Sequence, residues 1–179
     1  TELAMLFWEM GDPRSAIATL EQARQAGADS VAVRTKLAMY LAETGQVDRA
    51  LPLLEEAAAG QFPDLDALNA LGIALVRSGR VDQGAATFTR MLQLNGTNTS
   101  ALENLGAVAL ERGQIAQARD YFDRALALDP ASSQAHNSLG VIEMKSGNRT
   151  AAIAHWKHAV VGDSRNFDAL YNLGTELVN

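Results

Sequence analysis

Cysteine is absent from this chain of 179 residues, and its absence excludes disulfide bridges, thiol catalysis and thiolate metal sites. Basic residues are in the minority, since 15 Lys and Arg stand against 21 Asp and Glu, a formal net charge of −6. Nucleic-acid binding relies on a basic surface that neutralises phosphates, so we expect no nucleic-acid partner. Long apolar runs are missing as well. None approaches the about 18 residues that span a bilayer, so we expect no membrane insertion.

What remains is the composition of a folded protein, with a hydrophobic fraction of 47% and a charged fraction of 20%. A chain of this length buries enough apolar surface to fold without disulfide bridges. It begins at Thr1, already inside a helical pattern, so we expect it to be part of a longer protein. The sequence does not specify a compartment; a soluble protein of the cytoplasm or periplasm is the expectation.

Residues of the same kind recur at an interval of 34 positions along the chain. One series consists of Gly11, Gly45, Gly79, Gly113 and Gly147. A second series of small residues consists of Ala4, Ala38, Gly72, Gly106, Gly140 and Gly174. A third series is large and apolar and consists of Leu20, Leu54, Phe88, Phe122 and Trp156. Because these columns keep one period without insertion or deletion, the sequence predicts tandem repeats.

Each repeat has the pattern of two amphipathic helices joined by a turn. In the fourth repeat, apolar residues at helical spacing predict a first helix at about 100–112. Gly113 ends this helix, since glycine readily adopts the left-handed conformation that suits a helix C-terminus. The second helix is predicted at about 115–128, ahead of Pro130, which cannot continue a helix.

These columns resemble the tetratricopeptide repeat, a helix–turn–helix unit of 34 residues. The fourth repeat matches the family's pattern best, at Leu102, Leu105, Gly106, Ala118, Phe122, Ala125 and Pro130. The resemblance implies an all-α fold, a right-handed superhelical solenoid of antiparallel helix pairs. It divides residues 1–179, as a single array, into repeats at about 1–30, 31–64, 65–98, 99–132 and 133–166 and a lone helix at 167–179.

The resemblance also implies a binding surface, because the first helices of such repeats line the concave side of the solenoid. One asparagine lies on each first helix from the third repeat onward: Asn69, Asn104, Asn137 and Asn172. An amide side chain both donates and accepts hydrogen bonds, so it can pair with the main chain of a peptide of any sequence. The alternative is that these asparagines bond to a neighbouring helix or to water.

Apolar and basic side chains complete the candidate groove at Met5, Trp8, Lys36, Met39 and Ile73. An exposed apolar patch usually marks an interface, and methionine adapts to varied partners. The alternative for Met5 and Trp8 is packing against a part of the protein upstream of Thr1. Acidic residues at 66, 103 and 168 also point inward, so we expect a neutral or mildly basic peptide as the ligand.

Residue patterns for catalysis are missing from the sequence. No phosphate-binding loop or nucleophile elbow occurs, and the acidic residues fall on faces or turns that we expect to be solvated. His155 and His158 share one helix face, but a metal site needs a third ligand, so we expect surface histidines, no metal and no cofactor. His136, in the slot of the family's tryptophan, is expected to pack half-buried.

The leading prediction is a non-catalytic protein–protein interaction scaffold that holds a peptide or a partner domain in the concave groove. Two alternatives stay open. In the first, the chain is an accessory region of a larger enzyme, such as a hydrolase or a transferase. In the second, it is a self-assembly module, a homo-oligomer that forms through the apolar face of the last helix at Leu170, Leu173 and Leu177.

Overall fold

The computed structural model describes residues 1–59 and 63–178, and these residues form helices and turns without a β-strand. They divide into two compact bodies, an N-terminal body at Thr1–Met91 and a C-terminal body at Leu92–Asn179. The predicted all-α fold is confirmed. The boundaries of the repeats given above stay a prediction.

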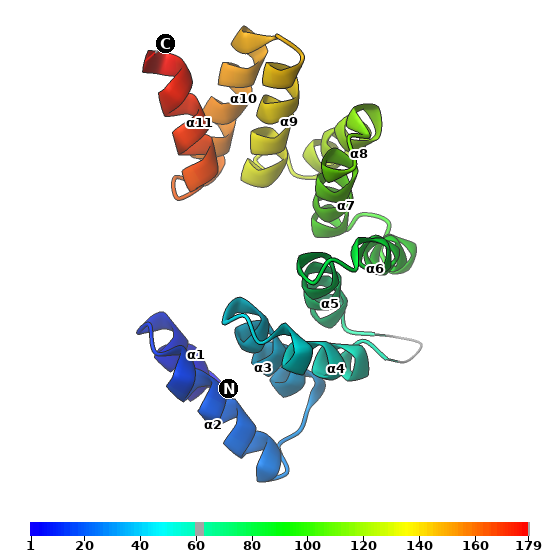
Figure 1. The fold of residues 1–179 in the computed structure, drawn as a ribbon, viewed down its shortest axis with the longest axis vertical. Helices are drawn as coiled ribbons and strands as arrows, with labels where there is room; N and C mark the ends of the chain where they lie inside the picture. The colour runs from blue at the N-terminus through cyan, green and yellow to red at the C-terminus, as the bar shows by residue number, and fades with distance from the viewer. Residues whose placement is uncertain (60–62, 179) are drawn as a thin grey trace. The chain divides into compact units, whose positions relative to one another are not determined.

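The N-terminal body is built from helices that pack on their neighbours in chain order (Figure 1). They are α1 (Glu2–Glu9), α2 (Pro13–Gln25), α3 (Val31–Glu43), α4 (Val47–Ala57) and α5 (Leu65–Arg77), followed by α6 (Val81–Leu94), which continues into the C-terminal body. Helix α5 contacts both α3 and α4. The first helices α3 and α5 therefore lie side by side.

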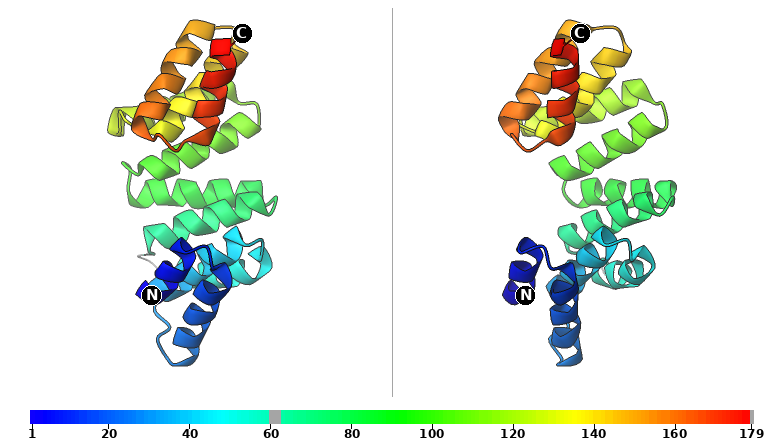
Figure 2. Two further views of the ribbon diagram at one scale, coloured as in Figure 1. Left: turned by 90° about the vertical axis from the view of Figure 1, so that its left-hand side faces the viewer. Right: turned by 60° about the vertical axis from the view of Figure 1, so that its left-hand side comes forward.

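The C-terminal body repeats this arrangement. Its helices are α7 (Thr99–Glu111), α8 (Ile115–Leu128), α9 (Ser133–Lys145), α10 (Arg149–Gly162) and α11 (Phe167–Val178). Helix α10 packs against both α9 and α11, and the two views of Figure 2 show it beside each of them. Across the part of the chain that the structure describes, no helix combines the length and the hydropathy needed to cross a membrane.

The helix ends lie close to where the sequence predicts them. Helices α7 and α8 agree with the predicted 100–112 and 115–128 to within one residue. Gly113 has a φ of +72°, the left-handed conformation expected after a helix C-terminus. Side chains at the preceding turns cap several first helices by accepting a hydrogen bond from the amide three residues later: Ser30, Asp64, Asn98 and Ser132.

The two helices of a repeat touch where a small residue meets a large one. A Cβ atom built on Gly72 would lie 2.3 Å from Cε1 of Phe88, so alanine at this position would clash with the ring. Where the small residue is Ala38, the large one is Leu54, and both are fully buried. The intrarepeat pairs are Ala4 with Leu20, Ala38 with Leu54, Gly72 with Phe88, Gly106 with Phe122, and Gly140 with Trp156. In the three repeats with glycine at this position, the size of one residue thus complements the size of the other.

The expectation that acidic residues are solvated is wrong for Glu143 on α9, which is only 8% exposed. Arg119 Nη1 donates to its Oε1 at 2.5 Å, and Asn148 Nδ2 donates to its Oε2 at 2.7 Å. These hydrogen bonds, from Asn148 and then Arg119, lower the pKa of Glu143. The positions one and two repeats earlier hold Ala109 and Leu75, both buried and apolar. Glu143 therefore occupies a core position, where Arg119 and Asn148 donate hydrogen bonds to its carboxylate.

Candidate functional site

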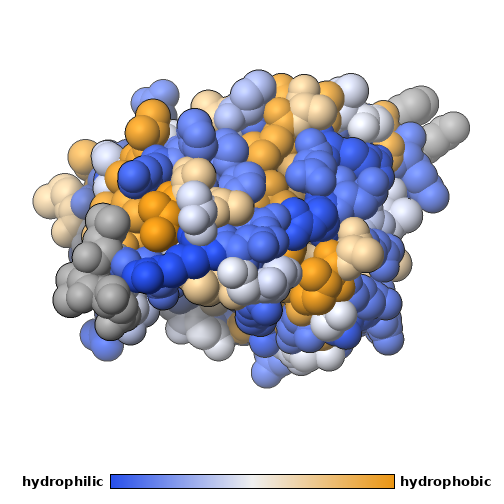
Figure 3. All heavy atoms as spheres, turned by 90° about the horizontal axis from the view of Figure 1, so that it is seen from above, coloured by the Kyte–Doolittle hydropathy of each residue, from blue (hydrophilic) through white to orange (hydrophobic). Residues whose placement is uncertain are grey.

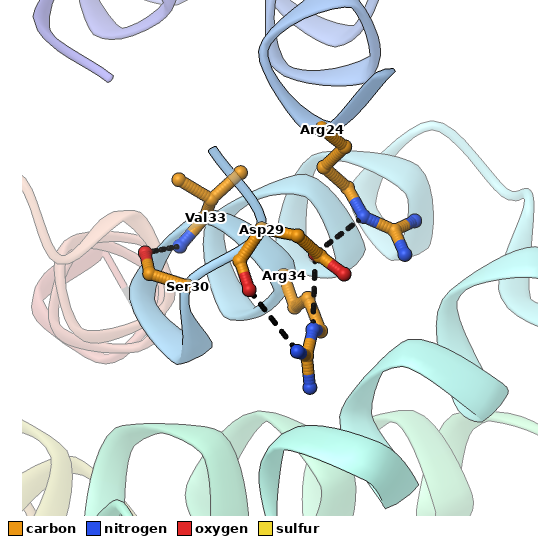
Figure 4. A network of polar contacts seen from close by, with 5 residues as sticks. All are labelled: Arg24, Asp29, Ser30, Val33 and Arg34. Atoms are coloured by element: carbon orange, nitrogen blue, oxygen red, sulfur yellow. Dashed lines mark hydrogen bonds and ion pairs between the residues drawn. The ribbon is translucent and has the colours of Figure 1, made fainter. Parts of the chain in front are cut away.

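The turn between α2 and α3 holds α3 in place (Figure 4). Asp29 accepts hydrogen bonds from Nε of Arg24 at 2.8 Å and from Nε of Arg34 at 3.0 Å, so one carboxylate bridges the two helices. Ser30 caps α3 by accepting from the Val33 amide at 3.3 Å. The hydrogen bonds from Arg24 and Arg34 lower the pKa of Asp29. These contacts anchor the start of α3, which forms one wall of the cleft described next.

The cleft lies between α3 and α5 in the N-terminal body and has a volume of about 440 Å³. Lys36 and Met39 line it from α3, Asn69 and Ile73 line it from α5, and Leu54 of α4 contributes as well. The first four are candidate groove residues of the sequence analysis. The structure brings them together because α3 and α5 are neighbouring first helices in the same register. We call this site the α3–α5 cleft.

Small side chains make room for the α3–α5 cleft, and charged ones stand at the helix ends beside it. Alanine lines it at positions 32, 42, 70 and 74. Asp64, the N-cap of α5, and Asp66, in the first turn of α5, also line it. Glu43 and Arg77 line it from the last positions of α3 and α5. The site therefore combines apolar walls with charges of both signs.

The Thr35 hydroxyl lies in the α3 wall of the same cleft. Thr35 is 5% exposed, and its Oγ1 has no hydrogen-bond partner among the described residues. A buried hydroxyl without a partner costs about 1–3 kcal/mol. Threonine in a helix populates two χ1 rotamers, so rotation about Cα–Cβ can present the hydroxyl to a molecule bound in the cleft.

The two candidate residues of α1 have different environments. Trp8 stacks on Tyr40 of α3, with ring centroids 4.0 Å apart and an interplanar angle of 2°. Met5 is 41% exposed. Trp8 therefore packs α1 onto α3 inside the N-terminal body, and Met5 lies at the surface.

In the C-terminal body the candidate asparagines of α9 and α11 bond to each other. Asn172 Nδ2 donates to Asn137 Oδ1 at 3.3 Å. A pocket of about 230 Å³ lies beside this pair and is lined by Val141 and Met144 of α9 and by Asn172 of α11. We call it the α9–α11 pocket. Asn104, on α7, is half-buried. For Asn137 and Asn172, the alternative of bonding to a neighbouring helix therefore describes the structure.

Glu103, next to Asn104 on α7, is half-buried as well and accepts a hydrogen bond from the Ser132 hydroxyl. Burial raises the pKa of Glu103, and the bond from Ser132 opposes that shift. Ser132 also caps α9. The inward position of this acid was predicted, but its link to the next helix cap was not, because Ser132 lies at the start of a different helix pair.

The three histidines of the chain come together, which the sequence analysis did not predict. Nδ1 of His136, on α9, lies 3.0 Å from Nδ1 of His155, on α10. Nε2 of His136 lies 3.2 Å from the Pro130 carbonyl oxygen, and the His158 ring stacks on the His136 ring at 5.0 Å. His158 is exposed, whereas His136 and His155 are half-buried. The described residues contain no group of three or more His, Cys, Asp or Glu placed to hold a metal ion.

Exposed apolar side chains gather on the outermost helices of the two bodies. In the N-terminal body they are Leu3, Met5, Leu6 and Met10 on or directly after α1. In the C-terminal body they are Val161 on α10 and Phe167, Leu170 and Tyr171 on α11. The face of the molecule in Figure 3 shows hydrophobic patches separated by hydrophilic bands.

Comparison with known families gives one match. A family model described as "Tetratricopeptide repeat" matches residues 1–66, 35–99, 69–135 and 103–155, which overlap along most of the chain. A search of curated proteins finds no match.

Solved structures with the same fold cover nearly all of the chain. TTC0263, a thermophilic TPR protein in Thermus thermophilus, is similar with a TM-score of 0.82 and 18% identity, over 99% of this chain and 97% of that one. A structure of MamA designated MSR-1 C2 has a TM-score of 0.64 and 26% identity, over 92% and 94%. YrrB, described as a TPR protein with an unusual peptide-binding site, has a TM-score of 0.63 and 19% identity, over 95% and 88%.

Proposed function

Because this chain belongs to the tetratricopeptide-repeat family, a family of protein-interaction scaffolds, we propose that it is a non-catalytic scaffold whose first helices bind a peptide or a partner domain. The α3–α5 cleft is the principal site in this proposal. Its ligand is a neutral or mildly basic segment with apolar anchors.

One observation carries the proposal. Lys36, Met39, Asn69 and Ile73, which sequence reasoning selected from separate repeats, line one cleft of about 440 Å³. Pockets that bind ligands are concave, mostly apolar and equipped with a few polar groups. Met39 and Ile73 supply the apolar walls, and Asn69 and Lys36 place polar groups among them.

Two further features support a peptide ligand. The Thr35 hydroxyl in the wall lacks a partner among the residues described, so a main-chain N–H or C=O of a ligand would remove the cost of burying it. Asp64 and Asp66 line the cleft beside the start of α5 and favour a basic side chain on the ligand. YrrB, with 19% identity and the same fold, is described as having a peptide-binding site, which makes peptides the first ligands to test.

The proposal is tested with a library of synthetic peptides of about seven residues, each carrying two apolar residues and one basic residue. Binding to the 179-residue chain is measured by fluorescence anisotropy. The double variant Met39→Glu with Ile73→Glu places two carboxylates in the apolar walls. We expect the Kd of the bound peptides to rise at least tenfold, about 1.4 kcal/mol or more, while circular dichroism stays unchanged.

The matched control is Ala86→Glu, which adds a carboxylate at an exposed position of α6 in the same body. It should leave the Kd unchanged. A second variant, Thr35→Val, should weaken binding and raise the Tm of the free protein, because it removes the unpartnered hydroxyl. Equal affinity in the wild type and in the double variant, or a library without a single binder, would contradict the proposal.

A second candidate is self-assembly through α11, which exposes Phe167 by 78%, Tyr171 by 74% and Leu170 by 39%. In this case the occupant of the apolar face is a second copy of the chain. Sedimentation velocity over a concentration series tests it, with Phe167→Glu as the disrupting variant. A strict monomer at all concentrations speaks against it. The third reading, an accessory region of a larger hydrolase or transferase, is decided by the full reading frame.

A further inference from the structure

We propose that His136 and His155 form an acid-released clasp, which holds α9 to α10 at neutral pH and opens when both rings are protonated. The clasp is independent of the α3–α5 cleft, because both histidines lie in the C-terminal body. It rests on the contact between their Nδ1 atoms and on the bond from His136 to the turn before α9.

The hydrogen bonds assign the tautomers of the two rings. The Pro130 carbonyl oxygen only accepts, so Nε2 of His136 carries the proton of the 3.2 Å contact. In a neutral His136 ring, Nδ1 is then an acceptor. Nδ1 of His155, 3.0 Å away, must therefore carry a proton and donate it to His136. One proton sits between the two Nδ1 atoms, and the pair links α10, α9 and the turn at Pro130.

The two protonation steps have different consequences. The first proton binds at Nε2 of His155 and leaves the Nδ1–H of His155 donating to His136, so the clasp stays closed. The second proton can only bind at Nδ1 of His136, where it meets the Nδ1–H of His155. The Nδ1–H groups of the two rings then face each other at hydrogen-bond distance without an acceptor between them. Both rings are also positively charged and repel each other. The clasp opens at this second step, and the two titrations belong to the pair.

The surroundings of the pair favour its neutral form. Burial lowers the pKa of both histidines, and the hydrogen bond to the Pro130 carbonyl opposes that shift for His136. His158 further lowers the pKa of His136, and His136 and His158 further lower that of His155. The other charged groups that act on the pair are Asp129 in the turn after α8, Glu143 on α9 and Arg119 on α8. The two acids raise these pKa values, and Arg119 lowers that of His155.

The direction of the pH effect follows from these shifts. Both histidines have a folded-state pKa below the 6.5 of a free histidine, so the unfolded chain binds protons first as the pH falls. The stabilisation is therefore fully present above about pH 6.5. It is lost progressively as the pH falls from there through the lowered folded-state values. Asn137, beside His136, bonds to α11, so release of α9 also affects the α9–α11 pocket.

The first test reads the tautomers directly. Long-range ¹H–¹⁵N spectra of the histidine side chains of the 179-residue chain are recorded from pH 8 to pH 5. We expect Nε2–H on His136 and Nδ1–H on His155 at neutral pH, and a two-step titration that both rings share. Hydrogen exchange of the amides in the first half of α9, corrected for its intrinsic pH dependence, should accelerate severalfold across the second step. Independent single-step titrations of the two rings would overturn the proposal.

The second test uses residues that the repeat already tolerates. His136→Leu with His155→Tyr installs the residues found one repeat earlier, Leu102 and Tyr121. Between pH 7.5 and 5.5 the wild-type Tm should fall by a few degrees, the scale on which one such interaction moves a domain of this length. The double variant should show no such fall. His158→Asn keeps both hydrogen bonds and should retain the fall. The same pH dependence in the wild type and the double variant would overturn the proposal.

Discussion

The α3–α5 cleft and the α9–α11 pocket occupy the same place in their two bodies, between neighbouring first helices, yet they differ in volume and in polar content. The first has about 440 Å³ and the second about 230 Å³. In the first, alanines at 42 and 74 leave space between the helices. In the second, Asn137 and Asn172 join α9 to α11 by a hydrogen bond. One repeat architecture thus produces a larger site in one body and a smaller one, beside a hydrogen bond between its two helices, in the other.

The repeat columns determine how the helices pack, and the residues between the columns determine the binding sites. The columns set the pairing of the helices, because a small residue must face a large one. The residues between the columns decide whether two first helices leave a cleft. They also decide whether a core position is apolar, as at Leu75, or carries a partnered acid, as at Glu143. Binding is therefore a property of single repeats, and folding a property shared by all of them.

The largest expected effect comes from Gly72→Ala, at the back of the α5 wall of the cleft. The added Cβ would lie 2.3 Å from the Phe88 ring, and overpacking of this kind costs about 1–3 kcal/mol. We expect a lower free energy of unfolding in urea and weaker peptide binding, because α5 must move. Gly72→Ala with Phe88→Leu reproduces the pair Ala38 and Leu54 and should recover most of the loss.

Gly174→Ala is the matched control for this change, since a Cβ built there meets nothing within 4 Å. It should raise the stability by about 0.5–1 kcal/mol, the usual gain for alanine over glycine inside a helix. If Gly72→Ala and Gly174→Ala change the free energy of unfolding alike, the complementary sizes of Gly72 and Phe88 do not determine how the two helices pack.

An intermediate effect is expected at Glu143, which occupies in the C-terminal body the position of the apolar Leu75 in the N-terminal one. Glu143→Gln keeps the shape but weakens the bonds to Arg119 and Asn148, and should cost about 1–2 kcal/mol. Glu143→Leu, which restores the residue type of Leu75, should be neutral or stabilising, because the 37% exposed Arg119 side chain can be solvated without its partner and a well-packed apolar group often contributes more than an ion pair. Urea unfolding measures both, and a larger loss for Glu143→Leu than for Glu143→Gln would contradict the argument.

The same site predicts a pH dependence. The folded-state pKa of Glu143 is lowered from 4.5, so its stabilisation is complete above that value and is lost as the pH falls through the lowered folded-state value. Glu143→Leu should reduce the loss of stability of the protein in this acidic range, which urea unfolding at a series of pH values measures.

The smallest effect is expected from Asn172→Ala. It removes one hydrogen bond between neutral amides, at 3.3 Å, and should cost less than about 1 kcal/mol. It also removes the hydrogen bond between α9 and α11, and we expect it to enlarge the α9–α11 pocket. Thermal unfolding measures the first consequence, and the peptide library measures the second. Peptides that bind Asn172→Ala but not the wild type, and that still bind when Met39→Glu and Ile73→Glu are added, would show that this hydrogen bond limits binding at the α9–α11 pocket.

Sequence reasoning predicted the fold well because its signals are local. Helical spacing placed α7 and α8 within a residue, and glycine placed the turn at Gly113. The period of 34 gave the register, and with it the neighbours Met39 and Ile73. These inferences need only contacts within a repeat or between equivalent positions of adjacent repeats.

The parts that sequence reasoning missed depend on contacts between positions that are not equivalent. His136 and His155 are 19 residues apart and meet only because two helices of one repeat lie antiparallel. Arg119 reaches Glu143 from another repeat, so a buried acid was mistaken for a solvated one. Trp8, a predicted groove residue, stacks on Tyr40 of α3, a contact that the repeat pattern does not predict. Side-chain direction, which the period does not encode, decides each of these cases.

The matched sizes of Gly72 and Phe88 also determine which duplications and recombinations of repeats preserve the helix packing. The two residues are 16 positions apart and belong to one 34-residue segment, as do the members of every other pair. A duplication or deletion of a whole segment therefore moves both partners together and creates no mismatch at this contact. Recombination that cuts between the partners of an alanine–leucine segment and a glycine–aromatic segment joins an alanine to an aromatic ring in one product and a glycine to a leucine in the other. The position of the cut, more than the number of segments exchanged, then decides how much stability the product loses.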